Sequence, residues 1–219
     1  MIKCVLFDFD GTLIDSNKVV VNCLKDSIQK YTNKEVQLKD LIPILGKPII
    51  DQMRFFSEEK CEEMTEYYRI SYRINEDANT YIYDNIEILL RNLKDQGYVI
   101  AITSNKGRRG IEFGLDKFNL TSYIDYIVSV EDVEMKKPHP ECVFKVMKEK
   151  GFSKEELIIV GDSPHDIGCG INAGIKTILV SWTLFPMEEF SKNSPDFIID
   201  DPLELMDIIK NESKIKKVR

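Results

Sequence analysis

Five short apolar runs, separated by polar stretches, constrain the fold of this chain more than any other feature. They lie at residues 4–7, 98–103, 126–130, 157–160 and 177–180 and are rich in β-branched residues. Uninterrupted apolar runs of this length are typical of strands that are buried on both faces. From residue 81 onward the runs alternate with stretches of helical periodicity. The pattern therefore predicts an α/β fold built on a parallel sheet.

The stretch 84–97 carries the clearest helix signals of the chain. Its apolar residues fall on one helical stripe, namely Ile86, Leu89, Leu90 and Leu93. Asp84 and Glu87 have the spacing of a capping box, and Gly97 suits the helix end. These signals predict a helix that begins at the capping box and ends before Gly97.

Residues 17–80 differ from the rest because they contain no strand-like run. Apolar residues recur there at helical spacing, as in Val20, Leu24, Ile28 and Tyr31. We therefore expect a mostly helical cap domain at 16–80, inserted into a core domain formed by 1–15 and 81–219.

Composition excludes several classes of function. The net charge is −7, without the basic footprint of a nucleic-acid-binding protein. Five scattered cysteines and two histidines form neither a disulfide framework nor a zinc motif, which suits a reducing compartment. The acidic N-terminus is not a signal peptide, and no apolar run reaches membrane-spanning length. We therefore expect a cytoplasmic protein with no nucleic-acid or membrane partner.

Polar residues follow four of the five runs at the point where each predicted strand ends. In parallel sheets, functional sites lie outside the carboxyl ends of the strands. These positions should therefore meet at one edge of the sheet. They are Asp8 and Asp10, then Thr103, Ser104 and Asn105, then Lys137, and finally Asp162 and Asp166.

Four carboxylates at one edge require a cation to offset their repulsion. Because the available ligands are hard oxygen atoms, they favour Mg²⁺. A magnesium ion beside a lysine and a hydroxyl group is suited to hold a phosphoryl group. One carboxylate can then attack phosphorus, and a second can transfer protons. This chemistry explains why two aspartates follow the first strand.

The motifs DFDGTLIDS, TSN, KKP and GDSPHD, in this order and spacing, resemble the four motifs of the haloacid dehalogenase superfamily. The resemblance covers nearly the whole chain. It points to the branch with a helical cap after the first motif, which includes phosphoglycolate phosphatases and a pyrophosphatase group. It implies a Rossmann-like core and an aspartyl-phosphate intermediate.

The resemblance also implies roles for individual residues. Asp8 matches the nucleophile, Asp10 the acid and base, and Lys137 the lysine that steadies nucleophile and phosphate. Asp8, the main-chain carbonyl of Asp10, and Asp162 match magnesium ligands, with Asp166 in support. In the last motif, Asp162 and Asp166 stand one helical turn apart, instead of the adjacent acidic pair of some members.

The phosphate-binding positions leave some alternatives open. Thr103 matches the phosphate-binding hydroxyl group, although Ser104 could share that role. Asn105 and Gly11 are further candidates for phosphate binding, Gly11 through its backbone. Lys136 competes with Lys137, and the proline that follows Lys137 favours Lys137.

The sequence thus predicts a Mg²⁺-dependent phosphatase of a small phosphorylated metabolite similar to phosphoglycolate, active as a monomer or homodimer. The alternatives are an inorganic pyrophosphatase of the same family, a sugar phosphomutase or, less favoured, a signalling protein that accepts a phosphoryl group. In the cap, Lys47 and Arg54 are candidates to meet the distal negative group of a substrate, although solvated charges are the simpler interpretation.

Overall fold

The computed structural model describes residues 1–215 and divides into two compact units. Unit 1 joins Met1–Leu13 to Ile82–Arg219, and unit 2 is Ile14–Tyr81. That unit 2 acts as a cap remains a prediction.

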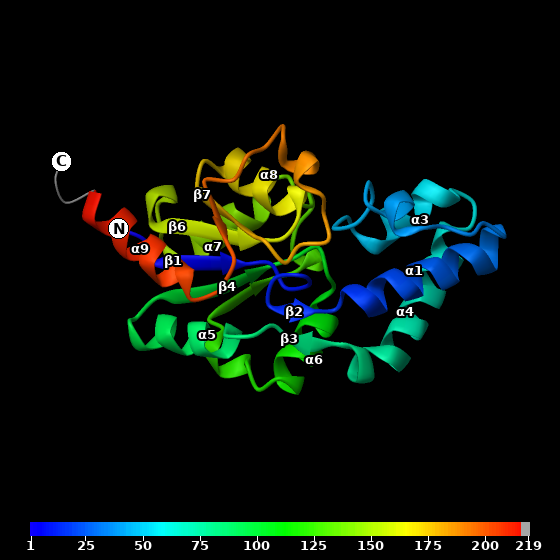
Figure 1. Ribbon diagram of the computed structural model, residues 1–219, viewed down its shortest axis with the longest axis horizontal. Coiled ribbons are helices and arrows are strands. Elements are labelled where there is room, and N and C mark those ends of the chain that lie inside the picture. Colours follow the sequence, from blue (N-terminus) through cyan, green and yellow to red (C-terminus); the bar gives the residue numbers. More distant parts are fainter. Residues whose placement is uncertain (216–219) are drawn as a thin grey trace. The chain divides into compact units, whose positions relative to one another are not determined.

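Unit 1 is built around a six-stranded parallel sheet with the strand order β5-β4-β1-β6-β7-β8 (Figure 1). In chain order the strands are β1 (Cys4–Phe7), β4 (Val99–Thr103), β5 (Tyr126–Val128), β6 (Leu157–Gly161), β7 (Lys176–Val180) and β8 (Phe197–Ile199). The helices are α5 (Ile86–Asp95), α6 (Arg108–Lys117), α7 (Glu141–Lys150), α8 (Pro164–Ala173) and α9 (Glu204–Ile215). Four short 3₁₀ helices complete the described elements, η1 (Thr121–Tyr123), η2 (Val130–Asp132), η3 (Lys154–Glu156) and η4 (Met187–Phe190). The predicted α/β fold with a parallel sheet is confirmed.

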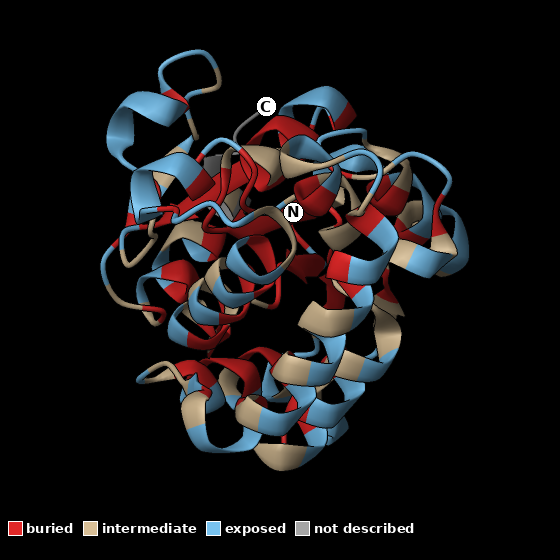
Figure 2. Ribbon diagram, turned by 90° about the vertical axis from the view of Figure 1, so that its right-hand side faces the viewer, coloured by how far each residue is buried: buried red, intermediate tan, exposed pale blue. Residues whose placement is uncertain are grey.

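The central strands are apolar throughout because both faces of the sheet are covered. On one face, Cys4 and Leu6 of β1 and Leu157 and Ile159 of β6 pack in a cluster with α7 and α8. Successive strand residues point to opposite faces, so the residues between them face the other side, where α5 lies (Figure 1). Every residue of β1 and β6 is buried. Figure 2 colours buried residues red and exposed residues pale blue.

Two features of unit 1 differ from the sequence analysis. The predicted capping box of Asp84 and Glu87 is wrong, because α5 begins at Ile86 after Asn85 in the left-handed conformation. The Asn85 side chain donates to Asp201 Oδ2 at 2.7 Å, a contact across 116 residues that local spacing does not reveal. The analysis also missed β8, whose three-residue apolar run is shorter than the others.

Unit 2 is mostly helical, as predicted. It contains α1 (Asn17–Thr32), α2 (Leu38–Leu41), α3 (Ile49–Phe56) and α4 (Cys61–Asn79), with the short strands β2 (Ile14–Asp15) and β3 (Tyr81–Ile82) paired at its boundary. The long helices α1 and α4 pack together through Val19, Cys23 and Tyr72. Ser27 Oγ also donates to the Met64 carbonyl at 2.8 Å. Among the described helices of both units, none is long and apolar enough to cross a membrane.

Candidate active site

The strand order brings three of the predicted residues to one edge of the sheet. Strand β1 lies between β4 and β6, and Phe7 is in register with Ile102 and Val160. Asp8 follows β1 directly, and its backbone N–H donates to the Val160 carbonyl at 2.9 Å. Thr103 ends β4 and Asp162 follows β6, so both lie at the same carboxyl edge as Asp8.

Three buried carboxylates meet at this edge. Oxygen atoms of Asp8, Asp162 and Asp166 all lie within 4.8 Å of one another. Burial, and then the charge of Asp166, raise the pKa of Asp8 to about 6, although Lys137 partly opposes the shift. Burial, Asp166 and Asp8 raise the pKa of Asp162 well above its usual range. The protein environment alone therefore disfavours the ionised form of both carboxylates.

Lys137 is the cation inside the cluster. Its Nζ donates to Asp8 Oδ1 at 2.9 Å, to the Thr103 carbonyl at 2.8 Å and to Asp166 Oδ1. The side chain is only 3% exposed. Burial alone would lower the pKa of Lys137, but Asp166 and Asp8 outweigh it and raise this pKa, so the ammonium group stays charged.

The structure brings Lys137, and not Lys136, to the carboxylates. The Lys136 Nζ instead donates to the carbonyls of Val130, at 2.7 Å, and Val133. Asn105 holds the backbone of Lys137 on both sides. Its Nδ2 donates to the Lys137 carbonyl at 3.3 Å, and its Oδ1 accepts from the Lys137 N–H at 3.1 Å. In this structure the Asn105 amide therefore positions the lysine.

Thr103 presents an unused hydroxyl group at the same edge. The residue is fully buried, and its Oγ1 has no hydrogen-bond partner within the described part of the chain. An unsatisfied buried hydroxyl group costs free energy unless a ligand completes it. The neighbouring Ser104 is also buried, but its Oγ accepts from the Lys106 N–H at 3.3 Å. The geometry therefore favours Thr103 as the group that binds a ligand oxygen.

The carboxylate of Asp10 lies apart from the three-carboxylate cluster. Both of its oxygens accept hydrogen bonds at 2.9 Å from Lys106 Nζ, which also lies 5.7 Å from the centroid of the Phe9 ring. The Asp10 carboxylate is therefore held by a cation of its own. The sequence analysis missed Lys106, although it directly follows the quoted TSN motif.

Gly11 and Asp162 fit against one another. Gly11 has φ +77°, and a Cβ there would lie 2.3 Å from Asp162 Oδ2. Only glycine adopts this conformation readily and leaves room for the carboxylate. Gly11 therefore leaves the space that the Asp162 side chain occupies.

Asp166 has a double role. Its Oδ2 accepts from Ser163 N at 3.0 Å, and its own N–H donates to Ser163 Oγ at 3.3 Å, which forms a capping box at the start of α8. Its Oδ1 accepts from Lys137. Ser163 was a further residue that the sequence analysis missed, although the S-x-x-D spacing could have revealed it.

The residues at this edge fit a magnesium ion. In the described part of the chain, no group donates a hydrogen bond to the Asp162 carboxylate, and burial, Asp166 and Asp8 all disfavour its ionised form. The donor set is entirely oxygen, without sulfur or imidazole, and hard cations prefer such a set. Asp8 and Asp162 are the carboxylates best placed to hold the ion.

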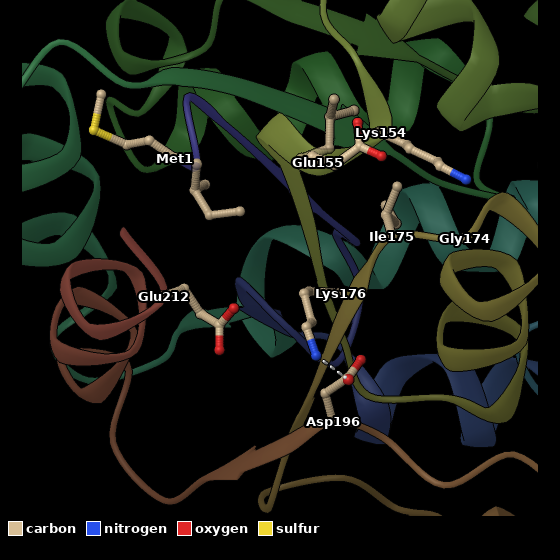
Figure 3. Close-up of a pocket in the computed structure, with 10 residues that line it drawn as sticks. Met1, Lys154, Glu155, Gly174, Ile175, Lys176, Asp196 and Glu212 are labelled. Atoms are coloured by element: carbon tan, nitrogen blue, oxygen red, sulfur yellow. Dashed lines mark hydrogen bonds and ion pairs between the residues drawn. The ribbon is translucent and has the colours of Figure 1, made fainter. Parts of the chain in front are cut away.

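A cavity of about 300 Å³ lies at the opposite edge of the sheet, at the amino ends of β6 and β7 (Figure 3). Its wall includes Ile2, Leu157 and Gly174, together with Lys176, whose Nζ is 2.6 Å from Asp196 Oδ1. None of the candidate site residues at the carboxyl edge lines this cavity. The carboxyl edge remains the candidate active site because the uncompensated carboxylates and the unsatisfied hydroxyl group lie there.

Comparison with known proteins shows which family the chain belongs to. A family model described as haloacid dehalogenase-like hydrolase matches residues 5–180. The chain is 35% identical over 213 residues to a protein of Bacillus cereus named pyrophosphatase PpaX, and the match covers 97% of this chain and 99% of that protein. A crystal structure of a predicted phosphatase from Clostridium acetobutylicum superposes with a TM-score of 0.84 at 27% identity, over 96% of this chain and 99% of the other. A predicted phosphoglycolate phosphatase from Haemophilus somnus has a TM-score of 0.87 at 20% identity, over 95% and 98% of the two chains, which shows a shared fold.

Proposed function

Because the chain belongs to the family of haloacid dehalogenase-like hydrolases, we propose that it is a Mg²⁺-dependent phosphatase that acts on a compact phosphorylated metabolite through an aspartyl-phosphate intermediate. The observation that supports this most directly is the position of Lys137. The buried ammonium group of Lys137 contacts Asp8 and Asp166, beside a third carboxylate that has no hydrogen-bond donor among the described residues.

Asp8, Asp162 and the main-chain carbonyl of Asp10 would hold the magnesium ion, and Asp166 would support it. When bound, the ion offsets the negative charge of the carboxylates and of the substrate phosphoryl group. Lys137 contributes a second positive charge from within the protein.

Asp8 is the nucleophile of the proposed reaction. One of its carboxylate oxygens attacks phosphorus, and the bond between phosphorus and the leaving-group oxygen breaks. Lys137 stays hydrogen-bonded to Asp8 and fixes the direction of attack, while the unsatisfied Thr103 hydroxyl group donates to a phosphoryl oxygen. The product is a phosphoryl group on Asp8.

Asp10 moves protons in both steps, starting from its protonated form. It first gives its proton to the leaving oxygen, and it then takes a proton from the water that attacks the phosphoryl group on Asp8, which restores the protonated form. The bond between phosphorus and Asp8 breaks, which releases inorganic phosphate and restores the carboxylate. Lys106, which holds both Asp10 oxygens, orients this group.

The substrate is either a phosphomonoester or a phosphoanhydride. The sequence analysis placed a monoester similar to phosphoglycolate first. Relatives that match over nearly the full length are named pyrophosphatases, and this favours the anhydride, so we infer that inorganic pyrophosphate is the leading substrate. Both substrates are compact and carry a second negative group.

The two cap candidates differ in their surroundings. Arg54 is already paired with Asp51 at 2.6 Å and with Glu58 at 3.2 Å, which supports the solvated-charge interpretation for it. Lys47 has no charged partner among the described residues, so it stays the candidate to recognise a distal anion. In that case Lys47→Ala raises the KM for pyrophosphate or phosphoglycolate and leaves hydrolysis of an aryl phosphate unchanged, with Lys34→Ala as the control.

The proposed function is tested by measuring the hydrolysis of a panel of substrates in the presence of Mg²⁺. The panel contains pyrophosphate, phosphoglycolate, an aryl phosphate, and a sugar phosphate with its bisphosphate. We expect the highest kcat/KM for pyrophosphate and, after acid quenching, a phosphoryl group on Asp8. Transfer to the sugar phosphate instead of water would establish the phosphomutase alternative. A stable phosphoryl group without turnover would indicate a signalling role.

A further inference from the structure

One peptide unit connects the two carboxylates that follow β6. The Asp162 carbonyl and the Ser163 N–H belong to the same planar peptide group, so they turn together. The Ser163 N–H donates to Asp166 Oδ2 at 3.0 Å. The side chain of Asp162, on the other side of this group, must fit beside Gly11, where no Cβ could be placed. A rotation of this one peptide would therefore displace both carboxylates.

Thr183 holds this peptide from across the sheet edge. Its Oγ1 donates to the Asp162 carbonyl at 2.5 Å, although 21 residues separate them. The same hydroxyl oxygen accepts from the Phe185 N–H at 3.0 Å, which fixes the direction of its proton. The hydroxyl group is therefore oriented before any ligand binds.

The loop that carries Thr183 is itself anchored on both sides. Just before Thr183, the Ser181 N–H donates to the Ile199 carbonyl of β8 at 2.9 Å, and the Trp182 ring lies 5.6 Å from the ring of Tyr83. After Thr183 in the chain, Phe185 is buried and packs edge-on against Phe190, with 6.4 Å between the ring centroids. These contacts make the loop a fixed support for the hydrogen bond.

We propose that Thr183 is a positioning residue for the metal centre: its hydroxyl group sets the plane of the 162–163 peptide and thereby the Mg²⁺ affinity of Asp162 and Asp166. This inference rests on the proposed function, because that function places Mg²⁺ at these carboxylates. Groups that orient metal ligands change metal affinity by about 10- to 100-fold when they are removed.

The test is isothermal titration of metal-free full-length protein with MgCl₂, without substrate. Thr183→Val keeps the shape of the side chain and removes the hydroxyl group, whereas Thr183→Ser keeps the hydroxyl group. Thr121→Val is the matched control, because it also removes a hydroxyl group bonded to a nearby residue, Asp116, outside the site. We expect Thr183→Val to weaken Mg²⁺ binding by about 10-fold or more, and Thr183→Ser and Thr121→Val to bind within about twofold of wild type.

A melting-temperature measurement in EDTA distinguishes a positioning role from a structural one. A residue that only stabilises the fold lowers the melting temperature and leaves the Mg²⁺ affinity unchanged. Equal affinity of wild type and Thr183→Val, or equal weakening in Thr183→Ser, would overturn the inference. If Thr183→Val does not fold, Thr183→Ala is judged by the same titration. A wild-type protein that binds no Mg²⁺ would instead overturn the proposed function.

Discussion

The Nζ atom of Lys137 lies 2.9 Å from Oδ1 of Asp8, although 129 residues separate the two in sequence. Both side chains are nearly inaccessible to water. A buried ion pair is weak evidence for stability, because the desolvation of two charges offsets much of their attraction. Here the pair also keeps a carboxylate with a raised pKa charged and oriented. The relationship is therefore better explained by the chemistry of Asp8 than by the stability of the fold.

Replacement of Asp8 by asparagine separates the contribution of this carboxylate to catalysis from its contribution to stability. Asp8→Asn keeps the shape of the side chain and removes the attacking charge, so we expect turnover to fall by at least ~10³-fold. Metal-free stability should stay close to that of wild type, because the substitution also removes a charge that repels Asp166 and Asp162. Steady-state kinetics and chemical unfolding in EDTA check both parts. Asp207→Asn, at a highly exposed position, is the control. Near-normal hydrolysis by Asp8→Asn would refute the mechanism.

Lys106 provides a test of how Asp10 is held. Lys106→Gln removes the cation that contacts both Asp10 oxygens. We expect kcat to fall by roughly 10-fold, which is less than the whole contribution that a general acid–base residue makes to the rate. A double-mutant cycle with Asp10→Asn measures the coupling: if Lys106 acts through Asp10, the second substitution adds little. Additive losses would show that Lys106 acts elsewhere. Lys148→Gln, on the exposed side of α7, should leave kcat unchanged.

Two glycines offer a matched comparison. Gly11 (φ +77°) and Gly97 (φ +79°) have nearly the same φ angle, but a Cβ would meet Asp162 at Gly11 and nothing within 4 Å at Gly97. Each alanine substitution should therefore cost about 1–2 kcal/mol of backbone strain. Only Gly11→Ala should also displace Asp162, and hence lose most of its Mg²⁺ binding and activity. Stability and Mg²⁺ titrations on both variants check this, and equal activity of the two would contradict the assigned role of Gly11.

Removal of the metal should affect stability as well as activity. Because the proposed Mg²⁺ ion would bind the folded chain and relieve carboxylate repulsion, a concentration of 100 Kd should stabilise the protein by about 2.7 kcal/mol. EDTA should abolish turnover and lower the melting temperature. Calcium should restore stability but not activity, because its larger and looser coordination shell misplaces nucleophile and phosphorus. Full activity in excess EDTA would rule out the metal requirement. Asp162→Asn should lose the stabilisation by Mg²⁺.

The pair of Asp196 and Lys176 predicts a pH dependence of stability away from the active site. Burial alone would raise the pKa of Asp196, but hydrogen bonds from Lys176 and Thr177 lower it below its usual value. The native state therefore favours the ionised carboxylate. Its contribution is present above the unfolded pKa of about 4 and is lost as the pH falls through the lower folded pKa. Urea unfolding should show Asp196→Asn to be less stable than wild type at pH 7, with a smaller difference near pH 3. A stability difference between the two proteins that does not change with pH would show that the ionised Asp196 carboxylate is not its cause.

The sequence by itself determined the sheet and the chemistry of its edge. Strands buried on both faces must be apolar throughout, so the runs that became β1, β4, β6 and β7 were visible in the local pattern. Parallel strands place their carboxyl ends at a common edge, so the sequence alone predicts that Asp8, Thr103 and Asp162 meet there. The family resemblance added roles for these residues. The cap was predicted from the mostly helical block at 17–80 that interrupts the α/β pattern.

Only the tertiary structure decided which side chains touch. Lys136 and Lys137 are adjacent in sequence and chemically alike, and only the path of the chain between β5 and α7 directs Lys137 into the cluster and Lys136 onto backbone carbonyls. The contacts of Lys106 with Asp10 and of Thr183 with Asp162 span 96 and 21 residues. The physical reason is that local periodicity depends on residues a few positions apart. Contacts between loops depend instead on the order of strands in the sheet, which is set by the packing of the whole unit.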